Sequence, residues 1–141
     1  MSKIDLLLKL DKSKLVRPTK EIEIKRLSEV LGEPFSVTVQ SITADEFEDI
    51  QNAVSINADG KVESEKNIQA KYVVSGIKDP DFNNQQVIEQ FGAVNAAEAV
   101  NNIFLPGEIT AIFNVINELS GFSKDSVKEI KNLSPETAKQ I

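Results

Sequence analysis

Carboxylates are the residues of this sequence with the greatest capacity for acid–base chemistry, because histidine and cysteine are both absent. Without histidine the chain lacks the commonest general base and metal ligand, and without cysteine it lacks thiolate nucleophiles and disulfides. Four carboxylates lie close together, at Asp45, Glu46, Glu48 and Asp49. Helical spacing places most of them on the polar side of an amphipathic helix, the usual place of solvated side chains. We therefore interpret them as surface residues and predict no catalytic residue and no enzyme activity.

Two segments resemble cation-binding loops, but neither has a complete set of ligands. Residues 55–66 have a partial EF-hand spacing, with Asp59 at the fifth position. An EF-hand loop needs an acidic first ligand and a glutamate at its twelfth position, whereas this segment has Ser55 and Lys66 there. Asp-Pro-Asp at 79–81 is explained by turn formation. Glycine-rich phosphate-binding motifs are also absent, so we predict no metal site and no cofactor.

Length and composition are those of one folded soluble domain, with 141 residues, 40% hydrophobic and 27% charged. Residues 1–26 contain eight Lys/Arg and four Asp/Glu, while residues 27–141 contain eight and eighteen. The first segment therefore has a net charge of +4 and the remainder a net charge of -10. An acidic body repels phosphate backbones, so we expect no nucleic-acid partner, and we interpret the basic start as a solvated linker.

Apolar runs are too short for a membrane segment. The longest run near the start is Leu-Leu-Leu at 6–8, whereas a membrane-spanning helix needs about 20 apolar residues. The N-terminus also lacks the apolar stretch of a signal peptide. We therefore expect a cytoplasmic protein that does not bind a membrane.

The first half of the chain has the patterns of short strands and one helix. We predict an arm over residues 1–19, comprising a short helix and a linker, and a domain over residues 20–141. Polar and apolar residues alternate over 21–26 and again over 35–39, which predicts a β-hairpin. The Thr-Ala-Asp-Glu sequence at 43–46 is a capping box, so a helix follows to about residue 54. Asp-Gly at 59–60 predicts the turn of a second hairpin.

The second half has the patterns of successive helices. Apolar residues from 68 to 77 recur at helical spacing, and that helix must end before Pro80. Further helices are predicted over 87–91, 96–104, 106–121 and 123–132. The predicted fold class is α+β, with a small N-terminal antiparallel sheet or hairpins followed by a mainly helical C-terminal half. Within the domain, residues 20–64 hold the hairpins and one helix, and residues 65–133 are helical.

The helix that begins at Pro106 has the strongest apolar stripe of the sequence. In most proteins such a stripe is core, but helices of a small domain can also leave a groove that accepts a partner's amphipathic helix. Sequence alone does not say which apolar residues face outward. The candidate partner-binding residues, in the stripe and in the turn before it, are Phe104, Leu105, Pro106, Glu108, Ile112 and Phe113.

Short motifs in a fixed order give the sequence a family resemblance. They are Pro-Thr-Lys-Glu at 18–21 with Ile-Glu-Ile-Lys-Arg-Leu at 22–27, Gly-Glu-Pro-Phe at 32–35, Gly-Ile-Lys-Asp-Pro-Asp-Phe at 76–82, Phe-Gly at 91–92, Leu-Pro-Gly-Glu-Ile at 105–109, Leu-Ser-Gly-Phe at 119–122 and Glu-Ile-Lys-Asn at 129–132. Each motif is weak alone, and their common order makes the set specific. The sequence resembles, over nearly its whole length, the XkdN-like tail assembly chaperones of phages and prophages that infect Gram-positive bacteria.

This resemblance implies a protein that binds the long, helical tape measure protein and keeps it soluble until tail tube subunits replace the chaperone. It implies no catalysis and a protein that is absent from the mature virion. The tail tube protein and a second copy of the chain are further candidate partners.

Two alternatives belong to other functional classes. A structural tail component, such as a tube or completion protein, would self-assemble or stay in finished tails. A small carboxylate-dependent hydrolase would need two acids paired in a cleft, and the sequence offers no such pair.

Overall fold

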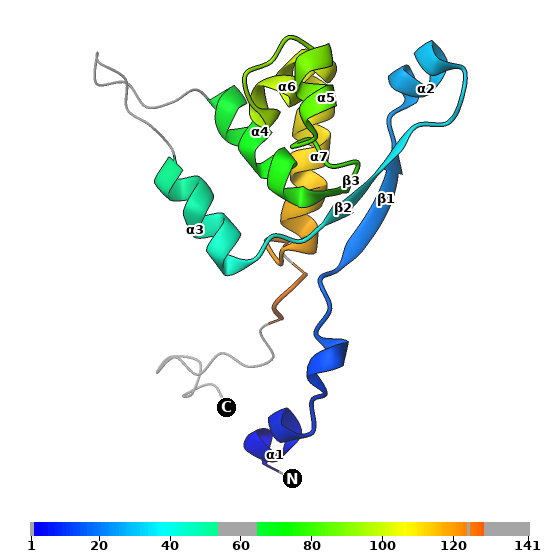
Figure 1. Cartoon of the computed structure of the whole chain (residues 1–141). Helices are drawn as coiled ribbons and strands as arrows, with labels where there is room; N and C mark the ends of the chain where they lie inside the picture. Colours follow the sequence, from blue (N-terminus) through cyan, green and yellow to red (C-terminus); the bar gives the residue numbers. More distant parts are fainter. Residues whose placement is uncertain (1, 54–64, 124, 129–141) are drawn as a thin grey trace, which may run out of the picture.

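Three antiparallel strands form one sheet, in the order β1-β2-β3. In the computed structural model, which describes residues 2–53, 65–123 and 125–128, these strands are β1 (Thr19–Glu23), β2 (Ser36–Gln40) and β3 (Ile77–Asp79). Thr19 pairs with Gln40 and Ile22 pairs with Val37. Figure 1 shows β1 and β2 as a long ribbon beside the helices. The predicted pairing of the first two strand segments and the α+β class are thus confirmed.

Helix α2 (Lys25–Leu31) lies between β1 and β2, where the alternating pattern had predicted that the first strand continues to residue 26. The strand ends earlier, and Gly32 closes the helix in the left-handed conformation at φ 75°. The Ser28 hydroxyl accepts a hydrogen bond from the Phe35 amide at 2.8 Å and donates one to Glu23 at 2.7 Å. These bonds fix the connection between the two strands.

The third strand was predicted as the end of a helix. Helix α4 (Glu65–Gly76) stops one residue before Ile77, which instead lies opposite Val39 of β2. An apolar residue at helical spacing fits either element, and pairing with a strand far away in the sequence decides the outcome here. As a result, the helical half of the chain also contributes to the sheet.

The predicted capping box is present at the start of α3 (Ala44–Ala53). The Glu46 amide donates to the Thr43 hydroxyl at 3.1 Å, and the Thr43 amide donates to the Glu46 carboxylate at 2.9 Å. Two backbone N–H groups that the helix cannot satisfy internally are thereby hydrogen-bonded.

Three further helices complete the described body of the protein. Helices α5 (Gln85–Gln90) and α6 (Ala96–Ile103) follow β3, and α7 (Pro106–Leu119) crosses behind the sheet in Figure 1. Helices α4, α6 and α7 and strand β2 supply most of the core. The largest fully buried side chains are Val37, Val39, Val73, Val100, Ile112 and Ile116.

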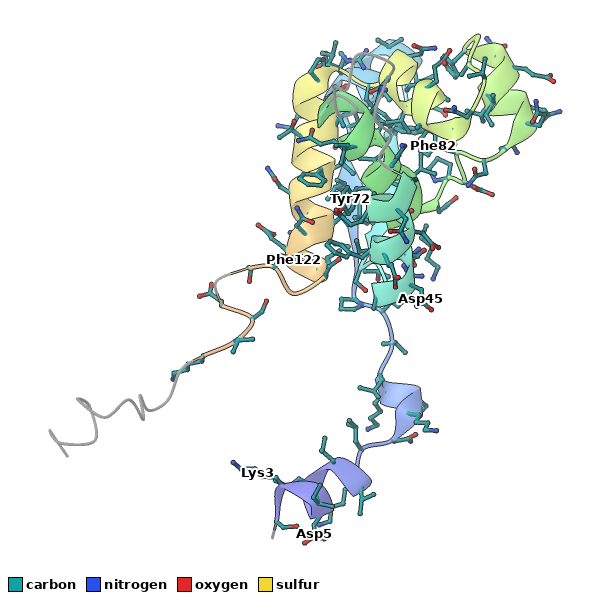
Figure 2. The ribbon with its side chains drawn as sticks, turned by 90° about the vertical axis from the view of Figure 1, so that its left-hand side faces the viewer. Lys3, Asp5, Asp45, Tyr72, Phe82 and Phe122 are labelled. Atoms are coloured by element: carbon teal, nitrogen blue, oxygen red, sulfur yellow. The ribbon has the colours of Figure 1, made fainter. Side chains whose placement is uncertain are left out.

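An arm precedes the sheet and extends away from the body in Figures 1 and 2. It contains α1 (Lys3–Leu8) and the short 3-10 helix η1 (Lys12–Lys14), and residues 2–16 are all exposed. Arg17 attaches the end of the arm to the body, because its guanidinium donates to the Ser41 carbonyl and to the Glu46 carboxylate, the latter at 2.6 Å. The proposed boundary between arm and domain after residue 19 stays a prediction.

Other predictions fall wholly or partly on residues that the structure does not describe. The second hairpin around residues 59–60 lies outside the described residues, and so does most of the EF-hand-like segment 55–66. Of the predicted last helix, residues 125–128 form turns and bends rather than a helix, and residues 129–132 lie outside the described part. None of the helices in the described ranges is long and apolar enough to cross a membrane.

Candidate partner-binding groove

An apolar groove lies between β1 and α7, with a volume of about 520 Å³. Below, it is called the β1–α7 groove. Its charged residues come from the end of β1, the start of α2 and the start of α7. Its apolar residues come from β1, from Ile24 directly after β1, and from the middle of α7. The lining residues are Ile22, Glu23, Ile24, Lys25, Arg26, Glu108, Ala111, Ile112 and Val115.

Regular geometry explains why these side chains meet. Residues 22 and 24 are two apart, so an extended backbone places both side chains on one face of the chain. On α7, residues 108, 111, 112 and 115 are three or four apart and lie on one face of the helix. Ile24 and Ile112 are buried at the base of the groove, whereas Ala111 is exposed and Val115 is half-buried. The groove therefore has an apolar base and accessible walls.

A bidentate ion pair joins the two sides of the groove. Arg26 donates from Nε to Glu108 Oε2 at 3.0 Å and from its terminal nitrogen to Glu108 Oε1 at 2.8 Å. The same nitrogen donates to the Ile103 carbonyl at 2.9 Å, and Glu108 also accepts the Leu105 amide at 2.7 Å. The start of α7 is thus held against the start of α2, and these charges are satisfied within the chain.

The ion pair shifts the acidity of both partners. Hydrogen bonding from Arg26 lowers the pKa of Glu108 below its usual value, although burial opposes this effect. The same contact raises the pKa of Arg26, which stays protonated. A carboxyl group whose pKa is lower in the folded than in the unfolded state stabilises the fold above the unfolded pKa, and this stabilisation is lost as the pH falls through the folded pKa.

We therefore expect Glu108→Gln to lower the free energy of unfolding at neutral pH and to have a much smaller effect in acid, where Glu108 is protonated. Urea unfolding of both proteins over a series of pH values measures this difference. Glu29→Gln, at an exposed position of α2, removes the same charge away from the groove and serves as the control. An equal loss of stability at every pH would show that the ionised pair does not contribute.

The six predicted partner-binding residues do not form one surface. Phe104 and Ile112 are buried, at 3% and 0% exposure, and Ile112 lies at the base of the β1–α7 groove. Phe104 packs edge-on against Phe82, with ring centroids 5.6 Å apart. The apolar stripe correctly marked the apolar face of α7, but that face is largely covered by the chain's own sheet and helices.

The other four predicted residues lie in different places. Glu108 lines the groove, while Leu105 and Pro106 are exposed at the N-terminal end of α7. Phe113 lies outside the groove lining and contacts Tyr72 of α4, with ring centroids 5.2 Å apart. The role of all six residues in binding stays a prediction.

Sequence reasoning missed most of the groove. Ile22 and Ile24 were predicted only as part of the strand segment 21–26, and neither Ala111 nor Val115 was singled out. Their spacing on α7 was a usable signal, since Glu108, Ala111 and Val115 recur every three or four residues. Nothing local indicates that Arg26 binds Glu108, because the two are 82 positions apart.

A second apolar surface lies at the end of the body from which the arm leaves. Phe47 of α3 lies 5.7 Å from Phe122 and 6.2 Å from Tyr72, measured between ring centroids. Phe47 is 36% exposed and Phe122 is 62% exposed. A pocket of about 310 Å³ beside these rings is lined by Ile42, Thr43, Ala44, Phe47, Ser120 and Phe122. We call these six residues the aromatic patch.

Comparison with known proteins identifies one family. The family model described as "Phage XkdN-like tail assembly chaperone protein, TAC" matches residues 4–132. No curated protein matches the chain. The crystal structure of the protein YqbN is similar in fold, with a TM-score of 0.57 and 19% sequence identity over 74% of this chain and 87% of that one.

Proposed function

Because the chain belongs to the family of phage XkdN-like tail assembly chaperone proteins, we propose that it binds the tape measure protein and keeps it soluble during tail assembly. Membership in the family establishes a role in phage tail assembly. The identity of the partner and the way it is bound are the proposal. The observation that carries it is the β1–α7 groove, an accessible apolar surface between a strand and a helix.

The shape of the groove favours a helical ligand. Its lining on α7 extends from Glu108 to Val115, which corresponds to about 10 Å, or two turns of helix. An amphipathic helix places its apolar side chains into such a groove at spacings of three and four residues. The tape measure protein is expected to be long and helical, so two turns of one of its apolar faces match the length available.

Charge at the groove favours binding over catalysis. Arg26 and Glu108 satisfy one another, and Glu108 has a lowered pKa, whereas a general acid needs a raised one. Covering an apolar helix requires a complementary apolar surface and no chemical step. We therefore propose a non-enzymatic chaperone that acts by binding alone.

Release follows from competition in this scheme. Tail tube subunits that bind the tape measure protein more tightly displace the chaperone by mass action, without an energy source. The chaperone then acts in the cytoplasm of the bacterial host and is absent from the finished virion.

Coexpression with the tape measure protein of the same phage tests the proposal. The expected result is that the tape measure protein stays in the soluble fraction and copurifies with this chain. Precipitation to the same extent with and without the chain would refute it. Mass spectrometry of purified particles adds a second readout, since a chain that persists in mature tails would instead be a structural component.

A further inference from the structure

The N-terminal arm exposes an unusual amount of apolar surface for a solvated linker. Its large apolar side chains are between 48% and 79% exposed, and none of them contacts a core. On a helical projection, the large apolar side chains of the first two turns occupy a broad arc of the helix. Ser2, Asp5 and Lys9 lie on the opposite side. These apolar residues are Ile4, Leu6, Leu7, Leu8, Leu10, Leu15 and Val16.

The sequence nevertheless specifies a helix in the arm. The Asp5 amide donates to the Ser2 hydroxyl at 3.1 Å, and the Ser2 amide donates to the Asp5 carboxylate at 3.2 Å. A helix of six residues is too short to persist in water without packing against another surface. A capped, apolar and very short helix is therefore expected to be stable only when something covers it.

The aromatic patch has the complementary properties. Its exposed Phe47 and Phe122 offer an apolar surface, and α3 carries four carboxylates, with no lysine or arginine. Of these carboxylates, Asp45, Glu48 and Asp49 are exposed. Residues 2–16 of the arm carry four lysines and two aspartates, so the arm is basic where α3 is acidic.

The arm leaves the body beside this patch. Arg17 is bound to Ser41 and Glu46, which adjoin the patch residues Ile42 and Phe47 in the sequence. Figure 2 shows Asp45 and Phe122 at the end of the body from which the arm departs, and Lys3 and Asp5 far from it. In this arrangement the arm does not cover the patch of its own chain.

We infer that the arm of one chain docks on the aromatic patch of a second copy, so that two chains form a symmetric dimer by exchanging arms. In each chain the arm leaves the body at the same end as the aromatic patch. A twofold axis at that end therefore lets each arm reach the patch of the other chain in the same way. Apolar arm side chains would cover Phe47 and Phe122, and arm lysines would face the carboxylates of α3. This inference does not depend on binding of the tape measure protein.

Sedimentation analysis of the purified full chain tests the inference. The expected mass is twice the 15.5 kDa of one chain, falling toward that of the monomer as the chain is diluted or salt is added. Leu7→Asp in the arm and Phe122→Asp in the patch should each give monomers, and neither should unfold the body because both side chains are exposed. Val30→Asp, at a 75% exposed position of α2, should remain dimeric.

Mixing the two monomeric variants provides the decisive control. The Phe122→Asp chain keeps its arm and the Leu7→Asp chain keeps its patch, so a tagged copy of the first should capture the second but not itself. A wild-type monomer would overturn the inference, including a monomer whose arm folds back on its own patch. Dimers that survive either substitution would also overturn it, as would failure of the mixed variants to associate.

Discussion

Replacing Ala111 with aspartate should weaken binding of the tape measure protein by about thirtyfold or more, equivalent to ~2 kcal/mol or the loss of one strong interface contact. Ala111 is an exposed residue in the wall of the β1–α7 groove, between Glu108 and Val115. A carboxylate there would lose its water when the apolar face of a partner helix covers it, and that apolar face brings no cation in return. Affinity for a purified tape measure segment measures the effect.

Stability should fall by less than about 1 kcal/mol, because Ala111 is exposed and aspartate is up to ~0.7 kcal/mol less favourable than alanine within a helix. Asn114→Asp is the matched control, since Asn114 is exposed on the same helix but does not line the groove. Equal binding by the Ala111→Asp and wild-type chains would place the partner on another surface. An equal loss of affinity in both variants would mean that the added negative charge weakens binding nonspecifically.

Gly76→Ala should lower the free energy of unfolding by about 2 kcal/mol, within the range for overfilling a packed core. Gly76 is the last residue of α4 and lies against α7. A Cβ atom at this position would overlap Ile116 Cδ1 and would lie 2.5 Å from Ile116 Cγ1. Ile116 is fully buried, so it has little room to move. This clash outweighs the gain of up to ~1 kcal/mol that alanine normally gives in a helix.

A double-mutant cycle identifies the cause. Ile116→Val alone should cost ~1 kcal/mol, because it removes a buried methyl-sized group. In the presence of Gly76→Ala the same substitution removes the clashing Cδ1 atom, so the double variant should be more stable than the sum of the two single effects predicts. Urea unfolding of the four proteins provides the four free energies. Simple additivity would contradict the contact between α4 and α7.

Local patterns in the sequence predicted the elements whose causes are local. The capping box at Thr43 depends on residues three apart, and the apolar stripe of α7 depends on spacing within one helix, so both were predictable. The pairing of the first two strand segments was likewise indicated by the alternation of polar and apolar residues within each segment.

Features that depend on distant residues were not predictable in the same way. Ile77 belongs to β3 because it pairs with Val39, a residue 38 positions earlier, and its helical spacing was misleading. The burial of Phe104 and Ile112 within the fold was not predictable either, because apolar periodicity marks a covered face without saying what covers it. The groove itself depends on the approach of β1 to α7, which only the tertiary structure shows.

Cross-linking from the groove tests the central claim most directly, and the absence of cysteine from the chain makes it practicable. A photoreactive cross-linker attached to Ala111→Cys, and separately to Asn114→Cys, would be activated in the complex with the tape measure protein. We predict a covalent adduct with the tape measure protein from position 111 in the groove and little or none from position 114. A complex that forms but cross-links equally from both positions, or only from position 114, would contradict binding in the β1–α7 groove.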